Sequence, residues 1–112
     1  MKDAVSFINP VTIYPLTSKS QSFTTDKWAI NNNANVTLEL HTISSSGLSC
    51  TAKVQGSLDG SSWFDIKGMQ VTISGNDDVF WSLSHIDSVY YLRVSVTIIA
   101  GSAIFNIQGR AT

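Results

Sequence analysis

The stretch from residue 50 to 66, CTAKVQGSLDGSSWFDI, places the tightest limit on the fold. Apolar side chains such as Cys50 and Val54 occupy every second position, which is the pattern of a strand with one face in the core and the other in water. At Asp59 and Gly60 the pattern stops. Glycine can take the positive φ of a tight turn, and aspartate can accept hydrogen bonds from the turn backbone. The sequence therefore predicts a β-hairpin here.

Similar alternation recurs elsewhere in the chain. Runs of alternating apolar and polar residues are bounded by Gly, Asn and Ser, and they cover residues 36–40, 69–73, 79–83, 90–98 and 103–107. No window has apolar residues at helical spacing for three turns. We therefore expect an all-β chain of seven to nine short strands, spaced about ten residues apart. A two-sheet antiparallel β-sandwich follows, with jelly-roll connectivity as the first choice and an immunoglobulin-like order as the second.

Turn residues suggest two further hairpins. The sequence GNDD at 75–78 predicts that the strands on either side of it, which include residues 69–74 and 79–83, pair with each other. Gly101 and its neighbours predict a closing hairpin that returns the long strand over 90–99 into the last strand.

The first thirty residues differ from the rest. Pro10 and Pro15 interrupt short apolar pieces, and a polar run follows them. Because proline is tolerated at sheet edges and not in central strands, residues 1–30 are expected to form an edge strand and a long loop, or an arm that packs on a neighbouring subunit. Residues 31–112 are expected to form the sandwich core of what is a single domain overall.

Composition narrows the partners. Charged residues make up 13% of the chain and the net charge is −1, while Ser, Thr, Asn and Gln supply about a third of the residues. Such a chain lacks the basic patch that nucleic-acid binding requires, so no nucleic-acid partner is expected. No apolar run has the length of a signal peptide or a membrane span, so we expect a soluble protein made in the cytoplasm. Cys50, the single cysteine, is expected to be buried and inert.

Catalytic and metal-binding patterns are weak. Ser84, His85 and Asp87 are the residue types of a hydrolase triad, but neighbouring side chains on a strand point to opposite faces, so we expect no enzyme. The two histidines, His41 and His85, lack a second ligand at a suitable spacing, and no cofactor or metal is expected. Loop carboxylates suit a calcium ion, and four acidic residues invite that interpretation, namely Asp59, Asp65, Asp77 and Asp78. The alternate acids of a calcium loop are missing, so Asp77 and Asp78 are expected to serve the turn after Gly75 instead.

Aromatic residues provide the remaining candidates. A flat aromatic face can stack on a sugar ring, and Trp63 at the tip of the predicted hairpin is best placed to do so. A packing role remains the favoured interpretation for Trp63, and still more for Trp81, because large aromatics usually fill the core of a small sandwich. The candidate ligand or interface residues are Trp63, Asp59, Asp77 and Tyr91.

Two family resemblances follow from these segments. Residues 54–63, VQGSLDGSSW, resemble the V-x-G-S-x-D-G-x-x-W hairpin of discoidin-type sandwich domains, many of which bind carbohydrate or lipid headgroups. The same hairpin, followed by the strand YLRVSV at 91–96 and a glycine turn, is similar to small structural proteins of tailed bacteriophages. Discoidin domains are longer and commonly carry paired cysteines, which this chain lacks, so the phage resemblance is preferred.

The phage resemblance implies a capsid decoration (cement) protein or a similar small virion component. Such a protein would reside in the virion, contact the major capsid protein or other virion proteins, and form a homo-oligomer, with a trimer favoured. The alternative is a carbohydrate-binding module or a tail receptor-binding domain that uses Trp63 and the loops near Asp59 and Asp77, with a glycan as its ligand.

Overall fold

The computed structural model describes residues 11–30, 35–84 and 89–111. Within these ranges all strand pairs are antiparallel. The same ranges contain no helix, and therefore no helix that could span a membrane. The strands are β1 (Val11–Lys19), β2 (Phe23–Thr24), β3 (Trp28–Ala29), β4 (Asn35–Ser57), β5 (Phe64–Ser74), β6 (Asp77–Ser84) and β7 (Tyr91–Ala111). The all-β prediction is confirmed.

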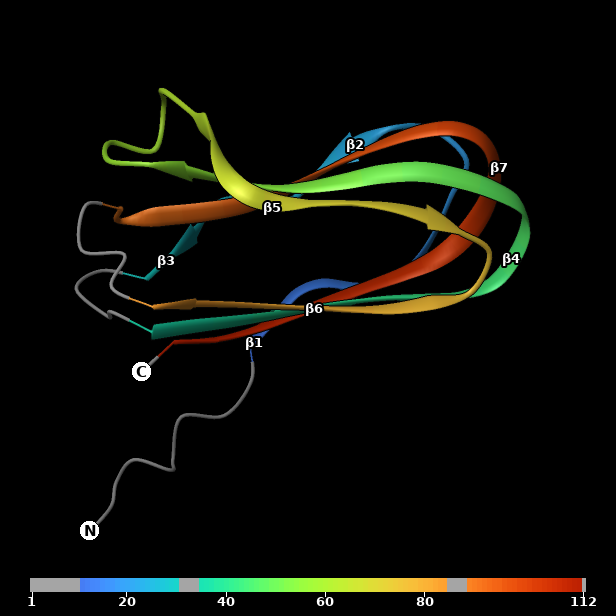
Figure 1. The fold of residues 1–112 in the computed structure, drawn as a ribbon, viewed down its shortest axis with the longest axis horizontal. Coiled ribbons are helices and arrows are strands. Elements are labelled where there is room, and N and C mark those ends of the chain that lie inside the picture. Colours follow the sequence, from blue (N-terminus) through green and yellow to red (C-terminus); the bar gives the residue numbers. More distant parts are fainter. Residues whose placement is uncertain (1–10, 31–34, 85–88, 112) are drawn as a thin grey trace, which may run out of the picture.

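Two long strands, β4 and β7, pair with each other along nearly their whole length. Val36 lies opposite Ala111 at one end of this ribbon, and Ser57 lies opposite Tyr91 at the other. Figure 1 shows that both strands turn back at the same end of the molecule, which we call the bend end. The bend divides each strand into two halves, and the halves lie in different layers.

The bend depends on backbone conformations that most residues avoid. Ser44, Gly47 and Gly101 have positive φ, and the pairing register shifts three times between Ile43 and Cys50. A Cβ atom at Gly101 would lie 2.3 Å from the carbonyl carbon of Gly47. The two strands can therefore approach this closely only because Gly101 carries no side chain.

The two layers follow from this ribbon. The first layer contains β1, residues 103–111 of β7, residues 35–43 of β4, and β6, in that order. The second layer contains β2 and β3, residues 91–98 of β7, residues 49–57 of β4, and β5. We count each half of β4 and β7 as a separate strand, and β2 and β3 together as one strand. The order of the eight resulting strands in the two layers is then that of a jelly roll. The first-choice connectivity is therefore confirmed.

Two predicted hairpins are wrong. β5 and β6 do not pair with each other, because β5 pairs with the second half of β4 and β6 pairs with the first half. The turn at 75–76 thus carries the chain from one layer to the other. Likewise the glycine at 101 bends β7 without reversing it onto itself. Turn residues indicate where a chain changes direction, but the available partner strand decides whether it stays in the same layer.

The predicted hairpin at Asp59 and Gly60 is confirmed. It joins β4 to β5, with Gly56 opposite Phe64 and Gln55 opposite Asp65. This hairpin lies at the end of the sandwich away from the bend end, and we call that end the hairpin end (Figure 1).

The core lies between the layers and is built from the alternate residues of every long strand. Phe105 is fully buried and makes a T-shaped contact with the Phe23 ring, which in turn stacks on Tyr14. Buried residues include Ile30, Val36, Leu38, Leu40, Cys50, Ala52, Val54, Ile73, Trp81, Leu92, Val94, Val96, Phe105 and Ile107. Burial of this apolar surface is the main stabilising term of a fold without disulfides.

Residues 11–30 belong to the sandwich, whereas residues 1–10 lie outside the described ranges. β1, β2 and β3 all pair with β7, and β1 forms an edge of the first layer. The register of β1 shifts on both sides of Tyr14, in the region of Pro15. An irregular edge strand is where a proline is accommodated, because the missing N–H removes no central hydrogen bond.

Candidate functional site

The hairpin turn is held by the side chain of Asp59. Its Oδ1 atom accepts hydrogen bonds from the backbone N–H groups of Ser61 at 2.8 Å and Ser62 at 2.9 Å, and from the hydroxyl of Ser57 at 3.0 Å. These bonds, those from Ser62 and Ser61 first, lower the pKa of Asp59. Gly60 has a φ of 81°. Asp59 thus serves the turn, and all of its described contacts are with its own loop.

A shallow groove lies beside this turn. Its lining comes from three places in the chain, namely the segment between β2 and β3, the hairpin, and β7, and its volume is about 400 Å³. We call this groove the cation groove, and it is lined by Thr25, Asp26, Lys27, Gly60, Trp63 and Arg93.

Arg93 is held on two sides within the cation groove. Its guanidinium carbon lies 4.2 Å from the centroid of the Trp63 ring, and its Nε donates a hydrogen bond of 2.8 Å to Oε1 of Gln55. Gln55 in turn donates to Asp65 at 2.8 Å, and Lys53 contacts the other oxygen of Asp65 at 3.2 Å. These contacts, that from Gln55 first, lower the pKa of Asp65. The chain of contacts fixes the orientation of the guanidinium on the outer face of the second layer.

Lys27 is placed in a similar way. Its Nζ lies 5.2 Å from the centroid of the Tyr91 ring, and Tyr91 shares an outward face of β7 with Arg93. Among the described residues, no carboxylate forms an ion pair with Lys27 or Arg93. The groove therefore presents two cations, each stacked on an aromatic ring and neither neutralised by the described part of the chain.

The structure brings three of the four candidate residues together. Trp63, Asp59 and Tyr91 lie at the hairpin end, whereas Asp77 begins β6 near the bend end (Figure 1). The fold therefore does not bring the loops near Asp59 and Asp77 into one continuous site.

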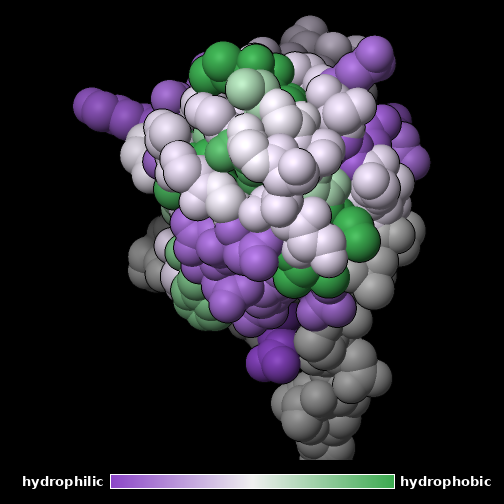
Figure 2. Space-filling view, turned by 90° about the vertical axis from the view of Figure 1, so that its right-hand side faces the viewer, coloured by the Kyte–Doolittle hydropathy of each residue, from purple (hydrophilic) through white to green (hydrophobic). Residues whose placement is uncertain are grey.

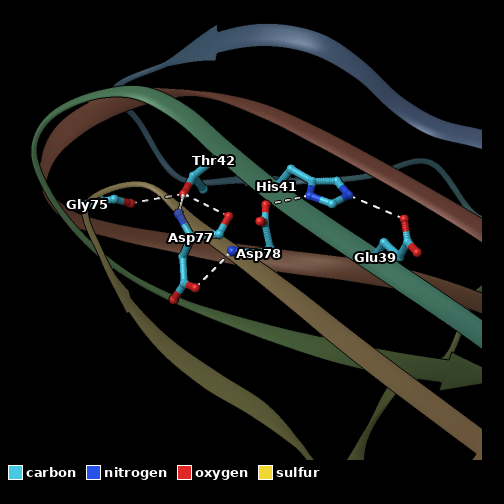
Figure 3. Close-up of polar contacts among 6 residues, drawn as sticks. All are labelled: Glu39, His41, Thr42, Gly75, Asp77 and Asp78. Carbon is cyan, nitrogen blue, oxygen red and sulfur yellow. Dashed lines mark hydrogen bonds and ion pairs between the residues drawn. The ribbon is translucent and has the colours of Figure 1, made fainter.

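Asp77 belongs to a second polar cluster, which Figure 3 shows. The hydroxyl of Thr42, a buried residue, donates to the carbonyl of Gly75 at 2.9 Å and accepts from the N–H of Asp77 at 2.8 Å. The Asp77 carboxylate accepts a hydrogen bond from the N–H of Asp78 at 2.8 Å. This cluster holds the turn that crosses between the layers.

His41 lies between two carboxylates in the same region (Figure 3). Its Nδ1 is 2.7 Å from Asp78, and its Nε2 is 3.3 Å from Glu39. The hydrogen bond to Asp78 is the largest cause of a raised pKa at His41, which Glu39 also raises and burial opposes. In residues 11–30, 35–84 and 89–111, no group of three His, Cys, Asp or Glu side chains could hold a metal ion.

The other chemical candidates carry no described site. His85 and Asp87 lie outside the described ranges, so the Ser84, His85 and Asp87 set has no geometry to report. Cys50 is buried, as predicted, and burial raises the pKa of its thiol.

Two further surface features stand out. Phe80 is 64% exposed on the outer face of the first layer, beside a concave region of about 270 Å³ that is also lined by Thr37, Glu39, Gln108, Gly109 and Arg110. Figure 2 looks onto the bend end and shows a mostly pale and hydrophilic surface with separate hydrophobic groups. Ile43 and Ile99, in or beside the bend, are exposed.

Sequence reasoning missed Lys27 and Arg93 as members of the candidate site. Arg93 lies in the strand YLRVSV, where its alternation with buried neighbours marks it as facing outward. Alternation indicates on which face of the sheet Arg93 lies but not which residues lie beside it on neighbouring strands. The contact with Trp63 could therefore not be predicted from the sequence.

Sequence comparison assigns no family, since no protein-family model and no curated protein matches the chain. Structural similarity is extensive. The SPBc2 prophage-derived protein YomS matches with a TM-score of 0.65 at 11% identity, over 93% of this chain and 92% of that one. The match therefore spans nearly the whole of both chains.

Two other solved structures have the same fold with different contexts. The T13 IBDV viral particle matches with a TM-score of 0.59 at 11% identity, over 92% of this chain and 30% of that one. The CBM22-2 xylan-binding domain from Paenibacillus barcinonensis Xyn10C matches with a TM-score of 0.52 at 8% identity, over 93% and 92% of the two chains. At these identities the likeness shows the β-sandwich fold, which is shared by prophage, viral and carbohydrate-binding proteins.

Proposed function

We propose that the chain is a non-enzymatic structural component of a bacteriophage particle that acts through contacts with other virion proteins. The observation that carries this proposal is Phe80, a large aromatic side chain exposed within a concave, hydrogen-bonding surface of the first layer. Glu39 and Arg110 supply charges of both signs around it. An apolar anchor with a polar rim is the usual anatomy of a protein interface.

The structural neighbours support this proposal, since one is prophage-derived and another is a viral particle. The exterior is rich in Ser and Thr and has few charged residues, which suits a protein that covers its neighbours in a shell. In its specific form the proposal is a capsid decoration (cement) protein, resident in the virion, that forms a homo-oligomer, a trimer by preference, on the major capsid protein.

The test uses particles of the phage whose genome encodes the chain. Density-gradient particles are analysed by mass spectrometry for the chain, and light scattering measures the oligomer in solution. Phe80→Ser should reduce cosedimentation with particles that lack the chain. Ser82→Ala is the matched control, because Ser82 is exposed on the same face of β6. Absence from particles, or full binding by Phe80→Ser, contradicts the proposal.

The second candidate is a carbohydrate-binding module or a tail receptor-binding domain. The cation groove at the hairpin end favours it, because the groove combines one aromatic ring, that of Trp63, with hydrogen-bonding side chains. The likeness to a xylan-binding domain supports it. A glycan array should give a signal that Trp63→Ala removes while circular dichroism shows an intact fold. An array without signal contradicts this candidate and leaves the structural role standing.

A further inference from the structure

The side chains of the cation groove indicate the kind of ligand that it would take. The guanidinium of Arg93 covers one face of the Trp63 ring. A sugar cannot stack on that face while Arg93 occupies it. What the groove offers there instead is the outer edge of a guanidinium, whose N–H donors form a planar fork that matches a carboxylate.

The position of that fork is fixed before any ligand arrives. Trp63 supports the guanidinium from its face and Gln55 accepts the Nε hydrogen at 2.8 Å. Gln55 is itself held by Asp65. Only the terminal nitrogens of Arg93 remain without a described hydrogen bond. A preorganised donor loses less conformational entropy on binding, which favours affinity.

Charge selects an anion. Lys27 lines the same groove, stacked on Tyr91, and no described carboxylate pairs with either cation. Charged residues are otherwise scarce in this chain, at 13%. Within the described residues neither Lys27 nor Arg93 forms an ion pair, so the groove carries a positive charge that the single carboxylate of Asp26 only partly offsets.

Asp26 decides between two classes of anionic ligand. It lines the groove and is exposed, and its carboxylate would repel a ligand that is acidic throughout. Thr25 is buried, and its hydroxyl oxygen already accepts the N–H of Val94 at 3.0 Å. The Asp26 carboxylate would instead accept hydrogen bonds from hydroxyl groups, as an acidic side chain does when it binds a polyol. A ligand with one carboxylate and several hydroxyls satisfies both sides of the groove, whereas an acidic peptide satisfies only the cationic side.

We propose that the cation groove binds a carboxylated sugar, of the uronic or sialic acid type, with its carboxylate on Arg93 and Lys27 and its hydroxyls toward Asp26. This inference rests on the second candidate function. It narrows that candidate from glycans in general to acidic ones, and it assigns Gln55 and Trp63 as positioning residues for Arg93.

Isothermal titration calorimetry with matched sugar pairs tests the proposal. Sialyllactose is compared with lactose, and tetragalacturonate with its neutral methyl ester. We expect the acidic member of at least one pair to bind at least about tenfold more tightly than the neutral one, because a charge-assisted bidentate contact is lost in the latter. Added salt should weaken the acidic member only.

Variants locate the binding to the groove. Lys27→Met and Arg93→Met should each weaken binding of the acidic sugar by at least about tenfold. Lys67→Met, which removes an exposed lysine from β5, should leave it unchanged. Thermal melts establish that each variant is folded. Should Arg93→Met fail to fold, Lys27→Met carries the test alone, because Lys27 is exposed and outside the regular strands.

The outcomes separate the inference from its premise. Equal binding of acidic and neutral sugars overturns the inference and keeps the second candidate function. Binding of a glutamate-rich peptide without any sugar overturns both and assigns the groove to a protein partner. Failure of both acidic sugars to bind overturns the inference whatever the peptide does.

Discussion

The guanidinium carbon of Arg93 lies 4.2 Å from the centroid of the Trp63 ring. This contact joins β7 to the loop between β4 and β5 on the outer face of the second layer. Trp63 is half-buried there, so it neither fills the core nor presents a free ring to solvent. Its role differs from that of Trp81, which is 7% exposed between the layers.

Trp63→Ala should therefore be tolerated far better than Trp81→Ala. We expect Trp63→Ala to lower the free energy of unfolding by about 1–2 kcal/mol, through the lost cation–π contact and partial burial. Trp81→Ala leaves a large cavity and should cost about 3–5 kcal/mol. Urea unfolding followed by circular dichroism measures both. Equal losses would mean that Trp63 is a core residue.

Gly101→Ala should strongly destabilise the bend. The new Cβ would meet the Gly47 carbonyl at a φ of 78°, so both backbone strain and overlap oppose it, at a total of about 3 kcal/mol or more. Gly68→Ala is the matched control, because Gly68 has a φ of 82° but open space around its Cβ position. That control should lose about 1–2 kcal/mol. Similar melting temperatures for the two variants would show that the bend tolerates a side chain.

Thr42→Val removes the hydroxyl that holds the turn between the layers. It leaves the N–H of Asp77 without its hydroxyl acceptor and the carbonyl of Gly75 without its hydroxyl donor. The expected cost is about 1–3 kcal/mol. Thr72→Val, at an exposed position of β5, should change stability by less than about 0.5 kcal/mol. If Thr42→Val leaves the free energy of unfolding unchanged, the Thr42 hydroxyl does not stabilise this turn.

The pKa of His41 should make stability depend on pH. Its pKa is raised above 6.5 in the folded protein, mainly by Asp78. The protonated form is favoured by folding, so the contribution is fully present below pH 6.5 and is lost as pH rises through the raised pKa. Because Asp78 is largely exposed, solvent screening keeps the contribution below about 1 kcal/mol.

Asp78→Asn should bring the pKa of His41 down toward 6.5 and flatten this part of the stability profile. A nuclear magnetic resonance titration of the imidazole protons reads the pKa directly. Glu39→Gln serves as the comparison, since its longer contact has the smaller effect. An unchanged titration in Asp78→Asn would rule out the ion pair in solution.

The parts of this fold that sequence could predict are those specified locally. The hairpin at Asp59 and Gly60 needs only its own residues, since the aspartate bonds to N–H groups two and three positions on. Inward and outward faces are equally local, because they follow from alternation along one strand. Burial of Cys50 and Trp81 could be read in that way.

The points where the chain crosses from one layer to the other could not be predicted from the sequence, because they depend on which strands pair. Alternation ends near Ile43 and resumes after Gly47 in the same way for a turn within a sheet and for a bend between sheets. The candidate site has the same limit. Arg93 meets Trp63 only because Gln55 lies opposite Arg93 on β7 and opposite Asp65 on β5. Those registers connect residues that are far apart in the sequence.

The shared ribbon of β4 and β7 also determines how this molecule can come apart. Each layer contains one half of β4 and one half of β7, so one layer cannot separate without disrupting the other. We expect the backbone amides of the two halves to exchange with deuterium at a common rate when the whole chain opens, with no partly folded species that keeps one layer. A molecule built in this way is either fully folded or unfolds as a unit.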